Sequence, residues 1–190
     1  MRVLGIDPDS NGSGWAIVGG DPPKVIEAGI FDSRGNTGIL GVEKQIMAIR
    51  ELAPQLPPVD IVAVEYPQHY RNPFQKFGAP MKVNPNHLMM IASIGGAVAG
   101  LANLRADGTV SLLRPAEWKG QRTKGATHRY VCRVVKWKYG LTSHPGNPLT
   151  EVIPHKDSKF HPWTGSSCKP WSEVLDAIGI ALYELKKRHP

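Results

Sequence analysis

The sequence predicts an α/β protein with a mixed five-stranded sheet, three antiparallel strands followed by two parallel ones, flanked by helices. Three short apolar segments near the N-terminus, separated by turns rich in Gly and Pro, predict an antiparallel meander. An almost continuous apolar run at 60–65 is typical of a strand buried on both faces, as in parallel sheets. Beyond it, helical and strand patterns alternate, which is the order expected when helices cover a mixed sheet.

Each element is predicted from apolar periodicity and from its flanking turn residues. Strands show short apolar runs, whereas helices show apolar residues three and four positions apart. Ser172 stands where it would cap the last helix, and basic residues in the last turn of that helix complement its dipole. The predicted strands are Arg2–Asp7, Gly12–Val18, Val25–Phe31, Asp60–Glu65 and Thr109–Leu113, and the predicted helices are Gly41–Leu52, Asn86–Leu104, Thr127–Lys138 and Trp171–Lys187, with a turn or short helix at Pro115–Lys119.

Length and composition indicate one soluble domain. With 190 residues, ordinary globular composition and no internal repeat, we expect a single domain over 1–190, with inserted loops at about 66–85 and 140–170. The chain has only two cysteines, too few for a disulfide framework, so a reducing, cytoplasmic setting is expected. It starts directly with a predicted strand, without a secretory leader, and no apolar stretch is suited to span a membrane.

The distribution of charge predicts a polyanionic partner. The net charge is +7 and the isoelectric point about 9.5, which favours binding to phosphates. Between residues 114 and 138, eight Lys or Arg side chains stand against one acid, so this segment accounts for the whole excess. The loop at 66–85 mixes aromatic and basic residues, a combination suited to unstacked bases and phosphates. The expected DNA-binding residues are Lys119, Arg122, Lys124, Arg129, Arg133, Tyr70, Arg71, Phe74 and Lys76.

Four carboxylates are the candidates for chemistry. Asp7 and Glu65 each end an apolar strand. Burying an unpaired carboxylate costs on the order of several kcal/mol, so two such acids indicate a bound cation. Glu173 and Asp176 are three residues apart and project from one face of a helix. Separately, each acid has an ordinary explanation in a turn, in a solvated strand end or near a helix dipole. Together they form a hard-oxygen site suited to Mg²⁺ or Mn²⁺.

These residues carry a resemblance to a known family. The strings concerned are Gly5-Ile6-Asp7-Pro8, Ser13-Gly14-Trp15-Ala16, Val62-Ala63-Val64-Glu65, Pro115 with Lys119, and Glu173-x-x-Asp176-Ala177-Ile178-Gly179-Ile180-Ala181. In this order they resemble the RuvC family of Holliday junction resolvases, through almost the whole chain. The resemblance implies an RNase H-like fold and a homodimer in which each subunit nicks one strand of a four-way DNA junction.

The resemblance also implies roles for individual residues. Asp7, Glu65, Glu173 and Asp176 fall at the acids that bind two Mg²⁺ ions, for which Mn²⁺ is expected to substitute. In relatives, position 173 is an aspartate or a histidine, so Glu173 is one methylene longer. Lys119 matches a catalytic lysine near the scissile phosphate. Lys124 matches a second lysine, although the connection between the two is shorter here.

The two inserted segments depart from the family pattern. The family often wedges an aromatic residue into the junction shortly after the middle glutamate, but Gln68 and His69 stand near that place, so the wedge stays open among Tyr66, Tyr70 and Phe74. Residues 140–170 contain three histidines and a cysteine, but their irregular spacing does not favour zinc. A flap over DNA or at a dimer interface is the favoured interpretation of this segment. The altered loops also suit a bacteriophage or mobile-element origin.

Three other functions compete with a junction resolvase. Sugar kinases and actin-like ATPases share a strand with Asp before a glycine-rich turn, but they need two such domains, and this chain has the length of one. A non-catalytic DNA-binding or scaffolding protein would keep the basic surface, but such proteins usually lose the acids. A nuclease of the same fold with another nucleic-acid substrate stays open, because a metal site does not select branch geometry.

Overall fold

The structure is a computed structural model that describes residues 1–32, 38–67, 85–103, 109–136 and 169–188. Strands and helices alternate along the chain in the predicted order. The strands are β1 (Arg2–Asp7), β2 (Gly12–Gly19), β3 (Lys24–Asp32), β4 (Ile61–Glu65) and β5 (Thr109–Leu113), and the helices are α1 (Gly38–Leu52), α2 (Pro85–Asn103), α3 (Pro115–Lys119), α4 (Lys124–Val134) and α6 (Lys169–Arg188).

The five strands form one sheet in the order β3-β2-β1-β4-β5. β1 pairs with β2, and β2 with β3, in antiparallel fashion, whereas β1–β4 and β4–β5 are parallel pairs. This is the predicted mixed sheet, and the fold-class prediction is confirmed. Because β1 and β4 are parallel neighbours, their carboxyl ends lie at the same edge of the sheet.

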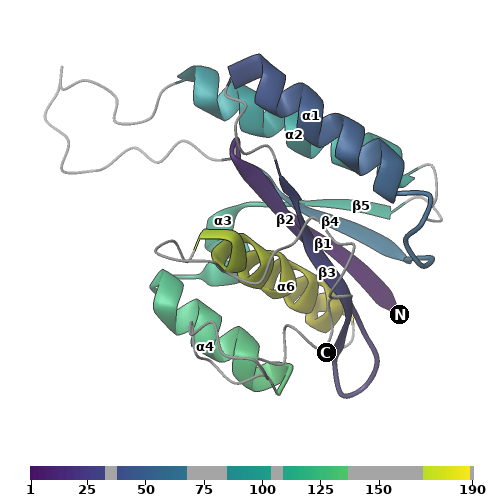
Figure 1. The fold of residues 1–190 in the computed structure, drawn as a ribbon. Helices are drawn as coiled ribbons and strands as arrows, with labels where there is room; N and C mark the ends of the chain where they lie inside the picture. Colours follow the sequence, from purple (N-terminus) through teal and green to yellow (C-terminus); the bar gives the residue numbers. More distant parts are fainter. Residues whose placement is uncertain (33–37, 68–84, 104–108, 137–168, 189–190) are drawn as a thin grey trace, which may run out of the picture.

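Helices cover both faces of the sheet (Figure 1). α1 and α2 lie on one face, and α6, with α4 outside it, lies on the other. Alternate residues of β1 enter opposite cores: Val3 packs in the cluster with α6, and Leu4 in the cluster with α1 and α2. In the described part of the chain, no helix has both the length and the apolarity needed to cross a membrane.

Several helix boundaries differ from the prediction by one to four residues, and α4 also ends earlier than predicted, at Val134 rather than Lys138. α4 begins at Lys124 rather than Thr127, because the Thr123 side chain accepts a hydrogen bond from the Ala126 amide at 3.3 Å and caps the helix. α6 begins at Lys169, so Ser172 lies inside the helix and the prediction that it is the cap is wrong. Pro170 is tolerated in the first turn because the missing N–H has no intrahelical partner there.

A glycine in β2 lets α6 approach the sheet at its functional edge. Gly14 pairs with Asp7 in the β1–β2 ladder. A Cβ atom at Gly14 would lie 2.1 Å from the backbone oxygen of Glu173, far inside van der Waals contact. The first part of α6 therefore lies directly on β2, next to the end of β1.

Candidate active site

Three carboxylates from opposite ends of the chain meet at the carboxyl edge of β1. Oxygen atoms of Asp7, Glu173 and Asp176 lie within 4.8 Å of one another. Asp7 ends β1, and the close approach of α6 at Gly14 brings the other two acids beside it. Asp7 is 6% exposed and Asp176 1% exposed, so these two charges have little access to bulk water.

The fourth acid, Glu65, is connected to this cluster through Lys119. The Nζ atom of Lys119 lies 3.4 Å from Glu65 Oε2 and 3.5 Å from Asp176 Oδ2. Glu65 ends β4 next to the end of β1, as the parallel pairing requires. We define these four acids as the carboxylate cluster.

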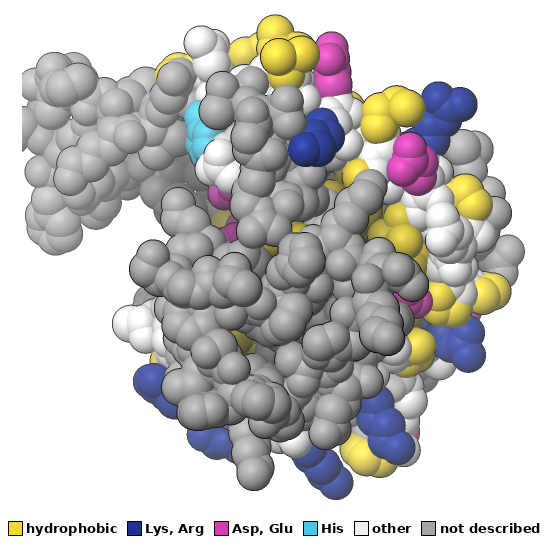
Figure 2. All heavy atoms as spheres, in the orientation of Figure 1, with side chains coloured by type: hydrophobic (Ala, Val, Ile, Leu, Met, Phe, Trp, Pro, Cys, Tyr) yellow, Lys and Arg dark blue, Asp and Glu magenta, His cyan; other side chains and the backbone are white. Residues whose placement is uncertain are grey.

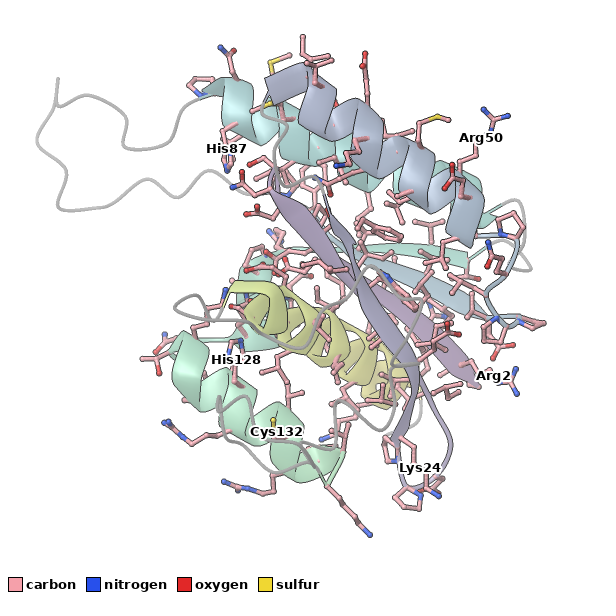
Figure 3. The ribbon with its side chains drawn as sticks, viewed as in Figure 1. Arg2, Lys24, Arg50, His87, His128 and Cys132 are labelled. Carbon is pink, nitrogen blue, oxygen red and sulfur yellow. The ribbon has the colours of Figure 1, made fainter. Side chains whose placement is uncertain are left out.

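Two further basic side chains reach the cluster from α4. The Nζ atom of Lys124 lies 3.2 Å from Asp176 Oδ2 and 3.6 Å from Glu173 Oε1. His128 projects from α4 towards α6 (Figure 3), and its Nε2 atom lies 3.1 Å from Asp176 Oδ1. Asp176 therefore contacts three basic side chains, one of them a buried histidine.

The two most buried acids of the carboxylate cluster, Asp7 and Asp176, have opposite electrostatic environments. Burial raises the pKa of Asp7 well above its usual value of 3.8, and the neighbouring charges of Glu65, Asp176 and Glu173 raise it further. Burial also acts to raise the pKa of Asp176, but the His128 hydrogen bond and the two lysines outweigh it, so the net shift is downwards. The basic side chains thus form their direct contacts with Asp176, Glu173 and Glu65, and they act on Asp7 only at longer range.

The remaining shifts follow from the same balance. Burial raises the pKa of Glu65 above its usual value of 4.5, although Lys119 and Trp118 counteract this. For both lysines burial acts to lower the pKa, but Asp176 leads the attraction from the acids and the net shifts are upwards. Lys119 and Lys124 therefore stay protonated at neutral pH and act as fixed positive charges.

The donor set fits a divalent cation. Three carboxylates meet at the site and Glu65 joins them through Lys119, and among the described residues two ammonium groups, those of Lys119 and Lys124, contact these acids. Burial first, and then repulsion from the neighbouring acids, raises the pKa of Asp7, and a bound cation would offset both effects. All the clustered donors are carboxylate oxygens, which suit Mg²⁺ or Mn²⁺ better than zinc.

A buried polar network holds the turn that follows Asp7. The Gln45 side chain of α1 is fully buried, and its Oε1 accepts hydrogen bonds from the amide and the hydroxyl of Ser13. Its Nε2 donates to the Asp9 carbonyl at 2.9 Å. The network ties α1 to both sides of the turn between β1 and β2, and so restrains the backbone next to Asp7.

The other predicted site residues lie apart from the cluster or outside the described residues. Arg129 and Arg133 are exposed on α4, and Arg122 lies over the ring of Tyr130 at 4.7 Å. Figure 2 shows dark-blue Lys and Arg side chains along the lower edge of the view, where α4 lies in Figure 1. The predicted DNA contacts that lie outside the described residues are Tyr70, Arg71, Phe74 and Lys76.

Sequence reasoning missed two side chains that contact the acids. His128 falls within the predicted helix Thr127–Lys138 but has no predicted role, and Trp118 is not among the predicted site residues, although the indole Nε1 of Trp118 donates to Glu65 Oε2 at 2.6 Å. A signal existed for His128: it stands four residues before Cys132 and three before Val131, on the side of the helix that carries the buried residues. No comparable periodic signal exists for Trp118, because α3 has only five residues.

Comparison with known proteins identifies the fold. No protein-family model and no curated protein sequence matches the chain. Among solved structures, Thermus thermophilus RuvC in complex with a Holliday junction substrate is similar, with a TM-score of 0.64, 18% identity and coverage of 100% of this chain and 95% of that chain. A second structure of the same protein has a TM-score of 0.62 and 17% identity, with coverage of 100% of this chain and 96% of that chain. The yeast mitochondrial Holliday junction resolvase Ydc2 has a TM-score of 0.46 and 11% identity, with coverage of 98% of this chain and 82% of that chain. The chain thus has the RNase H-like fold of RuvC, as the sequence predicted.

Proposed function

We propose that this chain is a divalent-metal-dependent endonuclease of the RuvC type that nicks four-way and other branched DNA. The observation that carries the proposal is the convergence of Asp7, Glu173 and Asp176, with Glu65 joined through Lys119, on a fold similar to RuvC over the whole chain. Two strand ends and one helix deliver these acids, so their convergence requires the tertiary fold.

Asp7, Glu65, Glu173 and Asp176 would hold the cations. Such ions, when bound, supply an activated water and a positive charge at the leaving oxygen. The protein itself contributes rigid placement of these carboxylates and two protonated lysines at the same site. Lys119 and Lys124 contact the carboxylates directly, and an incoming phosphate would compete for the same ammonium groups. A lysine beside the transferring phosphoryl group stabilises charge that develops there.

The branched substrate and the assembly are also parts of this proposal. The T. thermophilus RuvC structure contains a Holliday junction substrate, and we infer the same substrate class for this chain. The exposed basic residues of α4 would bind the DNA backbone, since each phosphate neutralised releases a counterion. Two subunits related by a twofold axis would place two nicks symmetrically across the junction, so a homodimer is proposed.

Cleavage of a synthetic four-way junction tests the proposal. We expect paired nicks in opposing strands with Mg²⁺ or Mn²⁺, none with EDTA, and none in a linear duplex of the same sequence. Asp7→Asn should bind the junction without cutting it. Light scattering should give twice the 20.8 kDa mass of the chain.

The same assay separates the competing functions. Metal-dependent cleavage of a flap or an RNA–DNA hybrid, with an intact four-way junction, would replace the proposed substrate with another one. Junction binding by the unaltered chain without cleavage in either metal would identify a DNA-binding or scaffolding protein instead.

A further inference from the structure

Trp118 is a buried residue whose one polar atom points at the carboxylate cluster. Its side chain is 6% exposed, and its indole N–H donates to Glu65 Oε2 at 2.6 Å. A buried indole N–H needs an acceptor, and a bond to a carboxylate is shorter and stronger than one to a neutral group. The ring thus contributes to the core through its carbon atoms and holds a site carboxylate through its nitrogen.

The ring of Trp118 rests on the backbone of α6. A Cβ atom at Gly179 would lie 2.4 Å from Cζ3 of the indole and 3.0 Å from Cε3, so a side chain at this position would displace the ring. Gly179 follows Asp176 by three residues on the same helix. The indole therefore spans from the helix that carries Asp176 to the strand that ends in Glu65.

The helix that carries Trp118 is short but well fixed. The Arg114 amide donates to Glu117 Oε2 at 2.7 Å, and the Glu117 amide donates to the Arg114 carbonyl oxygen at 2.9 Å, so two reciprocal hydrogen bonds fix the start of α3. Lys119 directly follows Trp118 in the sequence. Its Nζ atom lies 4.5 Å from the centroid of the Trp118 ring and also contacts Glu65 Oε2. Two consecutive residues of α3, Trp118 and Lys119, therefore contact the same oxygen atom, Glu65 Oε2.

We propose that Trp118, seated on Gly179, is a positioning residue that fixes the orientation of Glu65 for cation binding. Within the described part of the chain, the Trp118 and Lys119 contacts of Glu65 both use Oε2, so neither contact occupies Oε1, the oxygen that we assign to cation binding. A partner that orients a ligating carboxylate preserves its geometry and tunes its affinity. The inference rests on the proposed metal-dependent nuclease function and adds a residue to its site.

Two variants and two matched controls test this role. Trp118→Phe removes the N–H and keeps an aromatic ring, and Gly179→Ala displaces the ring without changing it. Trp15→Phe is the control for the first, because Trp15 is equally buried, also lies against a glycine, Gly29, and packs in the other core. Gly96→Ala is the control for the second, because nothing lies within 4 Å of a Cβ at that helical position.

We expect Trp118→Phe and Gly179→Ala to weaken Mn²⁺ binding, measured by calorimetry without DNA, by about tenfold to a hundredfold. The kcat for junction nicking should fall by a similar factor while KM for the junction is unchanged. Trp15→Phe should lower the Tm without changing Mn²⁺ affinity or kcat. If Trp118→Phe loses only stability, as Trp15→Phe does, Trp118 is a packing residue and the inference is overturned.

A nuclear magnetic resonance measurement separates this inference from the proposed function. The indole N–H resonance of Trp118, assigned by its loss in Trp118→Phe, should exchange slowly with solvent and should move when Glu65→Gln removes the charge. Added Mg²⁺ should shift this resonance in the unaltered chain. Fast exchange with an intact nuclease activity overturns the positioning role alone, whereas an unaltered chain that neither binds Mn²⁺ nor cuts DNA overturns both proposals.

Discussion

Gly14→Ala is the sharpest test of how the site is assembled. The added Cβ would lie 2.1 Å from the Glu173 carbonyl oxygen, whereas ordinary contact begins near 3.4 Å. Relief of this overlap requires the start of α6 and the strand to separate by about 1.3 Å, the difference between these two distances. A misplacement of about 1 Å costs on the order of a hundredfold in rate at a pre-organised site. Glu173 and Asp176 both move with α6, so we expect a loss of about this size in nicking rate.

The stability cost of Gly14→Ala should be of similar size, because a hundredfold loss in rate corresponds to about 2.7 kcal/mol and the overlap is with backbone atoms, which cannot rotate away. Overpacking of a core position typically costs about 1–3 kcal/mol, partly absorbed by backbone shifts. Single-turnover nicking of a four-way junction, measured well below the Tm of the variant, therefore isolates misplacement from unfolding. Gly96→Ala on α2 is the matched control and should be neutral or slightly stabilising, because alanine is favoured over glycine inside a helix. If Gly14→Ala changes neither the nicking rate nor the Tm, the close packing of α6 on β2 does not position Glu173 and Asp176, and the reasoning is refuted.

Four further variants probe charge at and around the carboxylate cluster. Asp7→Asn should raise the Tm of the metal-free chain, since it removes a buried carboxylate that lies near three other acids. It should also abolish the increase in Tm on adding Mg²⁺, which corresponds to a stabilisation of about 2.7 kcal/mol when the Mg²⁺ concentration is a hundred times its Kd. Lys119→Ala should lower kcat for nicking by about a hundredfold and weaken junction binding much less, because the ammonium acts on developing charge. Arg129→Ala and Arg133→Ala should weaken binding in gel-shift titrations and reduce the slope of log K against log salt by about 1 each.

The pH dependence of the Asp7→Asn effect has a definite sign. Burial, with the charges of the other acids, raises the folded-state pKa of Asp7 above its usual value of 3.8. Its contribution to stability is therefore fully present below about pH 3.8 and is lost as the pH rises through the folded-state value. In EDTA, the Tm advantage of Asp7→Asn over the unaltered chain should grow with pH and then level off.

Specific outcomes would contradict these predictions. A Tm difference between Asp7→Asn and the unaltered chain that stays constant across the acid range would mean that Asp7 is not a high-pKa group. Equal losses of binding and rate in Lys119→Ala would make that lysine a binding residue only. An unchanged salt slope after Arg129→Ala and Arg133→Ala would remove α4 from the DNA surface.

The positions of Asp7 and Glu65 at strand ends could be predicted from sequence, because a strand is recognised from a short run of neighbouring residues. Asp7 and Glu65 each follow an unbroken apolar run, and the carboxyl ends of parallel strands share one edge of a sheet. The spacing of Glu173 and Asp176 likewise predicted a shared helix face. That this face turns towards Asp7 depends on the close approach at Gly14, which is a matter of tertiary packing.

The residues that sequence reasoning missed are those whose partners lie far along the chain. Gln45 lies on the same helix face as Val42 and Ile49, so a polar residue on an apolar stripe was a visible signal of a buried hydrogen-bond network. Trp118 and His128 gave weaker signals, because Glu65 and Asp176 are 53 and 48 residues away from them. A helix start can also mislead: Ser172 has the right residue type for a cap, but Pro170 is compatible with an earlier first turn.

The distribution of positive charge indicates which acids of the cluster the protein neutralises directly and where a cation would act. His128, Lys119 and Lys124 all contact Asp176, and together they keep its pKa low despite nearly complete burial. Among the described residues, no basic side chain lies within ion-pair distance of Asp7, whose pKa is raised. Electrostatic strain is therefore concentrated at the end of β1, on the side of the cluster away from α4. A cation bound there would contact Asp7 directly, whereas Lys119 and Lys124 attract it only at longer range. Neutralising Asp7 by mutation and adding Mg²⁺ should therefore relieve the same repulsion and should not be additive.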